Sequence, residues 1–319
     1  MTNLLIYINR TEHRAWMYEE ALASAFPGIT IRIATNHEEA LGNASWMDIM
    51  VTYGGQLNDE LIAIAANLKW IHTLATGVDW VWRLEHLNKD VLVTSTRGIH
   101  GPPVSEMGLL LMMALGRGFL TFVDNQRTAN WVRYPGELLH GKTVGILGIG
   151  AIAEELVPKC KVMGMTVIGI SETERPVDGI DRFCYRRDLV GIAPELDHLV
   201  LLVPYTPETD SIINADVLAA MKPTAFLINL ARGGVVNEDD LIKALQTNSI
   251  AGAGLDAFRT EPLPAGSPLW RMENVIVTPH NSGLYDEYPN QALPILEHNL
   301  RCFLAEVPGD MINRVDGNT

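Results

Sequence analysis

The stretch Thr143-Val144-Gly145-Ile146-Leu147-Gly148-Ile149-Gly150-Ala151-Ile152-Ala153 predicts a strand, a G-x-G-x-x-A turn and the beginning of a helix. This order is typical of a dinucleotide-binding turn. Gly148 permits the tight turn and Gly150 lets the backbone approach a pyrophosphate, while the N–H groups of Ala151 and Ile152 point at the anion. Glycine-rich turns without a ligand share the pattern, but the flanking strand and helix favour the binding interpretation.

The end of the next predicted strand bears on the choice of dinucleotide. A dinucleotide-binding fold usually places an acid there for the ribose hydroxyls. This chain has Ser171 followed by Glu172, with Arg175 nearby. Ser171 with Arg175 would suit the 2′-phosphate of NADP, whereas Glu172 would accept a hydrogen bond from a free ribose hydroxyl and repel that phosphate. NAD and NADP both stay open, and Arg175 is equally compatible with an exposed loop position.

Short apolar runs alternate with amphipathic stretches along the chain, which predicts an α/β fold with two doubly wound parallel sheets. The strands predicted in the first part are 4–8, 29–34, 48–53, 70–74 and 91–94. Those predicted in the second part are 143–147, 166–170, 198–203, 225–229, 250–255 and 275–278. A turn-rich break at 96–103 separates the parts, and one long helix is predicted from Val104 to Asn130. The amphipathic tail 286–306 could cover either sheet.

Composition excludes several classes of protein. The 319 residues suffice for two domains of about 150 residues each, and 47% apolar content excludes a disordered chain. The net charge of −14 disfavours nucleic acid and membrane surfaces as partners. No apolar run approaches the ~20 residues of a membrane span. Three cysteines without a short spacing predict neither a disulfide framework nor a metal site, and favour a reducing cytoplasm.

Three ionisable residues follow three predicted strands of the second part. They are Arg232, Glu261 and His280. Because open α/β sheets bind ligands at the carboxyl ends of their strands, these side chains are candidates for one site. Taken singly, each has an ordinary structural alternative: an ion-paired arginine, a loop glutamate before a proline, a structural histidine. Their joint order along the chain is what favours an active site.

With the glycine-rich turn and Val203-Pro204-Tyr205-Thr206-Pro207-Glu208-Thr209, this order closely resembles the D-isomer-specific 2-hydroxyacid dehydrogenase family. Gly101-Pro102-Pro103-Val104-Ser105-Glu106 and Leu74-Ala75-Thr76-Gly77-Val78-Asp79 extend the resemblance over nearly the whole chain. It implies two Rossmann-like domains with the active site in the cleft between them. The substrate domain would be 1–99 with 286–319, and the dinucleotide-binding domain 100–285. A homodimer built on the dinucleotide-binding domains is also implied.

The resemblance assigns roles to particular residues. Arg232 would hold the substrate carboxylate and keto oxygen through its planar fork of donors. His280 would give a proton to the carbonyl oxygen as hydride arrives from the nicotinamide, while Glu261 would orient the imidazole and stabilise its charged form. Backbone amides around Thr76 and Gly77 would form a second clamp on the carboxylate. No metal is implied.

Further contacts with NAD or NADP are implied in the same way. Asp256 would contact the nicotinamide carboxamide, although acidic residues also end strands without such a role. Beyond the glycine-rich turn and the ribose segment, the residues predicted to bind the cofactor are Val203, Pro204, Thr209, Ala231, Asp256, Ser282 and Gly283. Trp131 lies where family members form the dimer contact. It is predicted to be a buried interface tryptophan, the alternative being a contact with the neighbour's substrate pocket.

The implied function is NAD(P)-dependent reduction of a small 2-keto acid to a D-2-hydroxy acid. Glyoxylate, hydroxypyruvate, pyruvate and larger acids all stay open, because the clamp reads only the shared carboxylate and carbonyl. A cofactor-sensing interaction module on the same fold is the alternative from another class, and the complete set of Arg232, Glu261 and His280 argues against it. A formate or phosphite dehydrogenase would need a pocket-filling substitution that the sequence does not identify.

Overall fold

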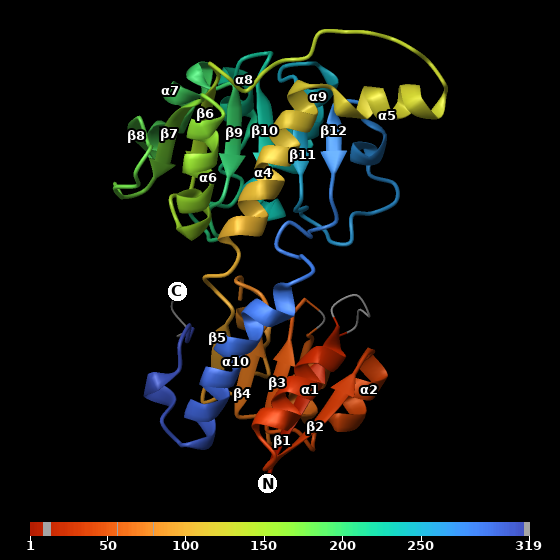
Figure 1. Ribbon diagram of the computed structural model, residues 1–319, viewed down its shortest axis with the longest axis vertical. Coiled ribbons are helices and arrows are strands. Elements are labelled where there is room, and N and C mark those ends of the chain that lie inside the picture. Colours follow the sequence, from red (N-terminus) through yellow and green to blue (C-terminus); the bar gives the residue numbers. More distant parts are fainter. Residues whose placement is uncertain (9–13, 56, 79, 316–319) are drawn as a thin grey trace. The chain divides into compact units, whose positions relative to one another are not determined.

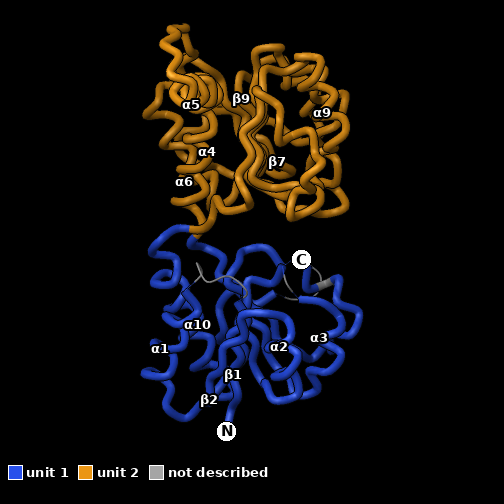
Figure 2. The backbone as a smooth tube through the Cα atoms, turned by 90° about the vertical axis from the view of Figure 1, so that its right-hand side faces the viewer, with its two compact units in different colours: residues 1–99, 285–319 blue, residues 100–284 orange. Residues whose placement is uncertain are grey.

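Two separate parallel sheets, each with its own helices, make up the protein. The structure is a computed structural model that describes residues 1–8, 14–55, 57–78 and 80–315. Asp79, which ends one of the family-like segments, lies outside these described residues. The chain divides into unit 1, residues 1–99 with 285–319, and unit 2, residues 100–284 (Figure 2).

Unit 1 is a five-stranded parallel sheet in the order β2-β1-β3-β4-β5 (Figure 1). Its strands are β1 (Thr2–Tyr7), β2 (Ile29–Ala34), β3 (Ile49–Thr52), β4 (Trp70–Thr73) and β5 (Leu92–Ser95). Its helices are α1 (Ala15–Ala25), α2 (His37–Asn43), α3 (Asp59–Ile64) and α10 (Tyr288–Leu304). Helix α10 packs against α1, so the C-terminal tail returns to the first sheet.

Local sequence explains why two of these helices begin where they do. The side chains of Asn36 and Asn58 accept hydrogen bonds from the backbone N–H groups of Glu39 and Leu61, which caps α2 and α3. Every residue of β3 and β4 is buried, as expected for parallel strands covered on both faces. The carboxyl end of β4 leads directly into the segment that contains Thr76 and Gly77.

Unit 2 is a seven-stranded parallel sheet in the order β12-β11-β10-β9-β6-β7-β8. Its strands are β6 (Thr143–Leu147), β7 (Thr166–Ser171), β8 (Arg182–Tyr185), β9 (His198–Leu201), β10 (Phe226–Asn229), β11 (Gly252–Leu255) and β12 (Val275–Val277). Its α-helices are α4 (Gly101–Gly116), α5 (Phe119–Arg127), α6 (Ala151–Val162), α7 (Leu189–Ile192), α8 (Ala215–Ala220) and α9 (Glu238–Gln246). The predicted α/β class with two doubly wound parallel sheets is therefore confirmed.

Helices cover the sheet of unit 2 in two layers (Figure 1). Helices α4 and α6 pack against each other and against strands of the sheet, while α8 and α9 pack together. Alternate residues of β9 point into the two cores on opposite faces of the sheet. Val200 belongs to the core under α4 and α6, whereas Leu199 and Leu201 belong to the core that includes residues of α8 and α9. The strand order reverses between β6 and β9, and such a switch point is where these sheets bind ligands.

The edge strand β8 was not among the predicted strands. The sequence pattern predicts six strands in this part, whereas the sheet has seven. The first and last residues of β8 are exposed and its two middle residues are only partly buried. An edge strand of this kind needs no continuous apolar run, which is why periodicity missed it.

The single helix predicted from Val104 to Asn130 is wrong. The segment forms α4 and α5, bent by 68° relative to one another. Gly118 lies between them at φ +56°, and a Cβ there would fall 1.3 Å from the hydroxyl oxygen of Tyr134. That hydroxyl donates to the carbonyl of Arg117 at 2.7 Å, so the chain turns where only glycine fits. Among the described helices, none alone has the length and apolarity to cross a membrane, and α4 with α5 meets that test only as a bent pair.

Candidate active site

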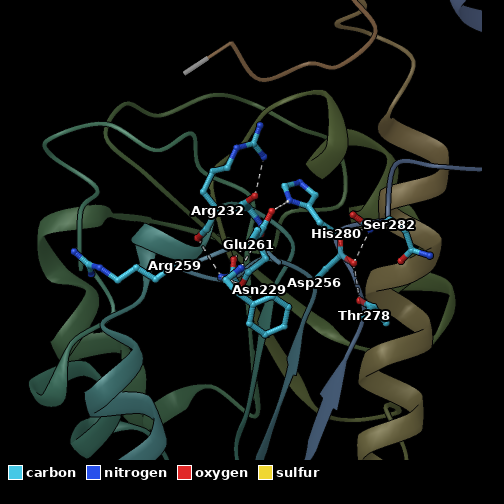
Figure 3. Close-up of polar contacts among 12 residues, drawn as sticks. Asn229, Arg232, Asp256, Arg259, Glu261, Thr278, His280 and Ser282 are labelled. Atoms are coloured by element: carbon cyan, nitrogen blue, oxygen red, sulfur yellow. Dashed lines mark hydrogen bonds and ion pairs between the residues drawn. The ribbon is translucent and has the colours of Figure 1, made fainter. Parts of the chain in front are cut away.

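The three predicted catalytic side chains come from three adjacent strand ends of unit 2. Arg232 follows β10, Glu261 lies in the loop after β11, and His280 follows β12. These strands are neighbours in the sheet and run parallel, so the loops beyond them meet at one edge. Figure 3 shows the three side chains at this edge, with Glu261 and His280 joined directly.

The loop that carries Arg232 is held by hydrogen bonds to the side chain of Asn229, the last residue of β10. Asn229 is 1% exposed. Its side-chain oxygen accepts a hydrogen bond from the N–H of Ala231 at 3.0 Å, and its amide nitrogen donates to the carbonyl of Arg232 at 3.1 Å. The guanidinium of Arg232 donates to the carbonyl of Ala231 at 2.9 Å. The backbone that presents Arg232 is therefore fixed by a buried amide.

Glycine at position 233 brings this loop against the next one. A Cβ on Gly233 would lie 1.8 Å from the carbonyl carbon of Phe258, a distance that no side chain allows. Gly233 therefore packs directly against the backbone of Phe258 and Arg259, just before Glu261. This close approach explains why the first of the two residues after Arg232 is a glycine.

Glu261 and His280 form a hydrogen-bonded pair. The Nδ1 atom of His280 lies 2.8 Å from Oε2 of Glu261, and the other carboxylate oxygen accepts the N–H of Phe258 at 2.9 Å. Burial raises the pKa of Glu261, but the hydrogen bond and charge of His280, with smaller contributions from Phe258 and Arg232, lower it below its ordinary value. Glu261 is thus a carboxylate at neutral pH, able to accept a hydrogen bond donated by Nδ1 of His280.

The segment that carries His280 is bound to Asp256. Asp256 is 1% exposed and its carboxylate accepts hydrogen bonds from Thr278, Asn281 and Ser282. His280 itself has φ of +51°, a left-handed conformation that is uncommon outside glycine. Sequence reasoning placed Asp256 beside the cofactor and did not anticipate these contacts. The Thr278 and Asn229 contacts were missed altogether, since short polar residues at strand ends carry no distinctive spacing.

The glycine-rich turn fits a dinucleotide. Gly148 has φ of +105°, and a Cβ there would lie 2.7 Å from backbone atoms of Leu202 and Val203, so the fold itself requires this glycine. Around Gly150 the position of a Cβ meets open space, so the protein alone does not require glycine there. Gly150 immediately precedes α6 and gives it no side-chain cap. The N–H groups at the start of α6, at Ala151 and Ile152, suit a pyrophosphate.

The segment predicted to hold the ribose, from Ser171 to Arg175, makes its contacts within unit 2. The Ser171 hydroxyl donates to the carbonyl of Thr173. Arg175 forms an ion pair with Glu154 and donates to the carbonyl of Ile149. Glu172 is instead paired with Arg186, which follows β8, at 3.0 Å.

Glu172 and Arg186 line a hollow beside the carboxyl ends of β7 and β8, together with Glu208 and the apolar side chains of Leu189 and Val190. Arg186 was not among the residues predicted to bind the cofactor. Its place beside Glu172 depends on β8, which was not predicted.

The other predicted cofactor-binding residues surround the same edge of the unit 2 sheet. The Thr209 hydroxyl donates to the carbonyl of Pro204 and accepts the N–H of Thr206, so it shapes its own loop. The remaining members and their burial are Val203, buried; Pro204, exposed; Ala231, buried; Ser282, buried; and Gly283, half-buried. Thr76 and Gly77 belong to unit 1, in the segment after β4. Among the described residues, no group of three His, Cys, Asp or Glu side chains could hold a metal ion.

Comparisons with known proteins agree on one family. The model of the D-isomer specific 2-hydroxyacid dehydrogenase NAD binding domain matches residues 109–282. A glyoxylate reductase of Thermococcus litoralis is 32% identical over 279 residues, which cover 84% of this chain and 84% of the relative.

Solved structures give the same result over the full length. A D-isomer specific 2-hydroxyacid dehydrogenase family protein from Aeromonas salmonicida has 31% identity and a TM-score of 0.88, with 100% of each chain covered. An NADPH-dependent glyoxylate/hydroxypyruvate reductase from Sinorhizobium meliloti, solved with NADP and sulfate, has 27% identity and a TM-score of 0.83, with 99% of each chain covered.

Proposed function

This chain belongs to the D-isomer-specific 2-hydroxyacid dehydrogenase family, and from that premise we propose how its residues divide the work and which substrates it takes. It is an NAD(P)-dependent oxidoreductase that reduces 2-keto acids. The substrate class we propose is a small acid such as glyoxylate or hydroxypyruvate, giving the D-2-hydroxy acid. The named activities of the relatives support this class.

Arg232 is the proposed anchor of the substrate. Its guanidinium binds the carboxylate and the keto oxygen, and hydrogen bonds from a planar cation to a carboxylate are among the strongest in proteins. The same charge beside the carbonyl favours the negative oxygen that develops as hydride is added. Backbone amides around Thr76 and Gly77 are the proposed second clamp on the carboxylate.

His280 is the proposed general acid, and its contact with Glu261 at 2.8 Å is the observation that carries the proposal. Nδ1 donates to the Glu261 carboxylate, which leaves Nε2 as the atom that gives its proton to the keto oxygen. The bound reduced nicotinamide supplies the hydride. In the reverse direction Nε2 takes the hydroxyl proton, and the Glu261 carboxylate favours the imidazolium that results.

The unit 2 sheet edge is the proposed cofactor site. The glycine-rich turn and the first N–H groups of α6 hold the pyrophosphate. Ser171, Glu172 and Arg175 stay assigned to the ribose end, and Arg186 joins them because of its pair with Glu172. Val203, Pro204, Thr209, Ala231, Asp256, Ser282 and Gly283 stay assigned to the remaining length of NAD or NADP.

The test is the loss of reduced-nicotinamide absorbance with NADH and, separately, NADPH, against a panel of 2-keto acids. We expect turnover with glyoxylate or hydroxypyruvate, and chiral analysis of the product should give the D-hydroxy acid where the product has a stereocentre. Turnover only with branched or aromatic acids would contradict the proposed substrate class. A protein that binds dinucleotide but turns over no acid would contradict the enzymatic role.

A homodimer through unit 2 is the proposed assembly. Helix α5 has no buried residue although it begins with Phe119, and Trp131 beyond it is 92% exposed in the single chain. Other exposed apolar side chains of this region are Leu110, Met113, Val132 and Leu138. Burying such a surface favours association, and a second copy of the chain is the proposed occupant.

Light scattering should give about twice the monomer mass of 35.2 kDa. Phe119→Asp with Trp131→Asp should shift the mass to that of the monomer. A wild-type monomer at every concentration would contradict this assembly.

The proposed location is the cytoplasm, with a small acid and the cofactor as the partners. Cys160, Cys184 and Cys302 are all free thiols, which suits a reducing compartment. The net charge of −14 works against binding nucleic acid or an anionic membrane. Because Cys160 and Cys302 are buried, the test is acid quenching of the cells followed by alkylation of the denatured protein. All three cysteines should be labelled, and an oxidised population would contradict the location.

A further inference from the structure

The segment that leads from β4 to Thr76 and Gly77 is held by a side chain from the other end of the sequence. Tyr288 is the first residue of α10 and is 1% exposed. Its hydroxyl donates a hydrogen bond to the carbonyl of Leu74 at 2.5 Å and lies 3.0 Å from Oγ1 of Thr96. All of these residues belong to unit 1, so the C-terminal part of the chain supports a loop of the first sheet.

The direction of these hydrogen bonds follows from the chemistry of the groups. A carbonyl oxygen only accepts, so the single proton of the Tyr288 hydroxyl is the one shared with Leu74. The Thr96 hydroxyl, which lies farther from the carbonyl of Thr73, at 3.4 Å, is then the donor to the Tyr288 oxygen. Burial raises the pKa of Tyr288, so the hydroxyl keeps its proton at neutral pH. Thr96 and Tyr288 therefore form a chain of two donors that ends at Leu74.

The next carbonyl along the segment turns toward the same place. The N–H of Thr96 donates to the carbonyls of Thr73 and Ala75 at 3.1 and 3.3 Å. The successive carbonyls of Leu74 and Ala75 are therefore both held on the side of Thr96. Because the N–H of a trans peptide group points away from its carbonyl, the N–H groups of Ala75 and Thr76 are directed to the opposite side. Successive N–H groups on one side of a segment favour the binding of an anion.

The far end of the segment is held by a second side chain. The indole N–H of Trp80 donates to the carbonyl of Gly77 at 3.2 Å. The indole lies against Gly54, where a Cβ would fall 2.0 Å from a ring carbon. Leu74 is fully buried, whereas Thr76 is exposed. The segment is thus fixed at both ends and reaches solvent between them.

We propose that Tyr288 is a positioning residue for the carboxylate clamp, and that its hydroxyl fixes the peptide groups whose N–H groups face the substrate. This inference rests on the proposed function of the segment at Thr76 and Gly77 as that clamp. Without the hydroxyl, the carbonyl of Leu74 loses its donor inside the protein, and its peptide group rotates toward another. The N–H groups beyond it then no longer converge on one carboxylate, so we expect weaker binding of every 2-keto acid.

The expected kinetic effect follows from what the clamp holds. The substrate carboxylate keeps its charge while the neighbouring carbonyl is reduced, so a group that holds the carboxylate contributes equally to the ground state and the transition state. Loss of such a group raises KM and leaves kcat nearly unchanged. A residue needed only for folding would instead lower the fraction of active enzyme, which lowers the apparent kcat and leaves KM as it was. KM and kcat therefore separate a positioning role from a structural one.

The variants are Tyr288→Phe, Thr96→Val and Thr96→Ser, with Tyr285→Phe as the matched control. Tyr288→Phe removes only the hydroxyl. Thr96→Val removes the donor to Tyr288, whereas Thr96→Ser retains it. Tyr285 packs edge-on against Tyr288 with 5.8 Å between the ring centroids. The control therefore removes a hydroxyl from the same aromatic cluster without removing the donor to Leu74.

For each variant we would measure kcat and KM for the keto acid, the Kd of NADH, and the Kd of oxamate for the complex with NADH. Oxamate carries the carboxylate and the adjacent carbonyl of a 2-keto acid but is not reduced. Tyr288→Phe should raise KM and the Kd of oxamate about 10-fold, the effect of losing one hydrogen bond to a charged group. Both kcat and the Kd of NADH should stay within about twofold, since the residues proposed to hold the cofactor belong to unit 2. Thr96→Val should show a smaller increase, which Thr96→Ser and Tyr285→Phe do not show.

Hydrogen exchange of the full-length protein without ligands gives a readout that is independent of activity. Peptides that contain residues 74–78 should exchange about 10-fold faster in Tyr288→Phe than in the wild type, because a loosened segment opens more often. Tyr285→Phe should exchange like the wild type. If no keto acid is reduced and oxamate does not bind, the clamp fails as a proposed function, and the exchange rates still show whether Tyr288 holds the segment.

Unchanged exchange in Tyr288→Phe would overturn the inference. Faster exchange with an unchanged KM and Kd of oxamate would overturn it as well, because the hydroxyl would then stabilise the segment without positioning it for a substrate. A lower kcat with an unchanged KM would have the same meaning. If circular dichroism shows that Tyr288→Phe does not fold, the comparison of Thr96→Val with Thr96→Ser carries the test.

Discussion

At the scale of single residues, the groups proposed to do chemistry are held by neighbours that do none. Asn229 fixes the backbone of Arg232, and the N–H of Phe258 fixes Glu261. Catalysis by proton transfer and electrostatic stabilisation depends on such fixed geometry, because donors that are already oriented need no reorganisation during the reaction. The loss of one of the three catalytic groups should therefore be severe while the fold persists.

His280→Ala should lower kcat about 10²- to 10⁴-fold, the range typical for loss of a general acid. Arg232→Ala should lower kcat and also raise KM, because the guanidinium is proposed to bind the carboxylate in the ground state as well as the developing negative charge. Steady-state kinetics on folded variants would measure both effects. The exposed Arg259, which lies 3.9 Å from Asp210, provides the control Arg259→Ala with little expected change. Wild-type rates in either catalytic variant would remove the assignment.

The three residues proposed to be catalytic could be picked out from the sequence, but the residues that hold them in the structure could not. Arg232, Glu261 and His280 stand out because each follows a strand in a recognisable order. Asn229 and Thr278 are short polar residues at strand ends, and their importance arises from which backbone groups lie beside them after folding. Those neighbours belong to loops of different strands, so no local pattern contains the information.

At the scale of elements, the turn between β6 and α6 contains one glycine that the fold requires and one that is proposed to bind the cofactor. Gly148→Ala should lower the free energy of unfolding by at least about 2 kcal/mol, since it adds a Cβ at positive φ against backbone atoms. Gly150→Ala should fold normally because its Cβ meets open space, yet raise the Kd of NADH about 10-fold by filling the approach to the pyrophosphate. Urea unfolding measures the stability and NADH fluorescence measures the Kd. Equal free energies of unfolding for Gly148→Ala and Gly150→Ala would contradict the different roles given to the two glycines.

The ion pair that joins the ends of β7 and β8 leads to a prediction about the cofactor. Glu172→Gln should lower the ratio of the Kd for NADPH to the Kd for NADH about fivefold, because it removes a negative charge that repels the 2′-phosphate and releases Arg186 from its pair. Arg175→Ala should leave this ratio nearly unchanged, since Glu154 and the carbonyl of Ile149 already hold Arg175. Titration with each dinucleotide measures this ratio of Kd values. A ratio that changes in Arg175→Ala but not in Glu172→Gln would contradict the proposed role of Glu172 in the choice of cofactor.

Elements with continuous apolar patterns were predicted to within a few residues, and the failures have a common cause. The buried strands β9 and β10 have apolar runs that periodicity detects. The edge strand β8 and the bend at Gly118 depend instead on tertiary neighbours, such as the Tyr134 hydroxyl that occupies the place of a Cβ. The arrangement of Glu172 and Arg186 was missed for the same reason, because it required β8.

At the scale of the whole molecule, each unit contains a buried histidine that ties its stability to pH. Burial lowers the pKa of His72 in unit 1 to about 3. In unit 2, burial lowers the pKa of His198 to about 4, and the nearby Asp197 opposes this only in part. Both side chains are neutral in the folded protein, whereas in the unfolded chain a histidine takes up a proton near pH 6.5.

The sign of the pH effect follows from this difference. Below pH 6.5 the unfolded chain binds protons that the folded protein excludes, so the stability present above pH 6.5 is lost as the pH falls toward 4. Between pH 7 and 5 each of these histidines should lower the free energy of unfolding by about 2 kcal/mol. His198→Phe keeps the stacking on Phe226 and should remove the contribution of His198 to the pH dependence of the free energy of unfolding. The control His86→Gln changes an exposed histidine and should leave that pH dependence unchanged. Urea unfolding of the full chain at both pH values measures the difference, and the same pH dependence in wild type and His198→Phe would show that His198 is not the titrating group.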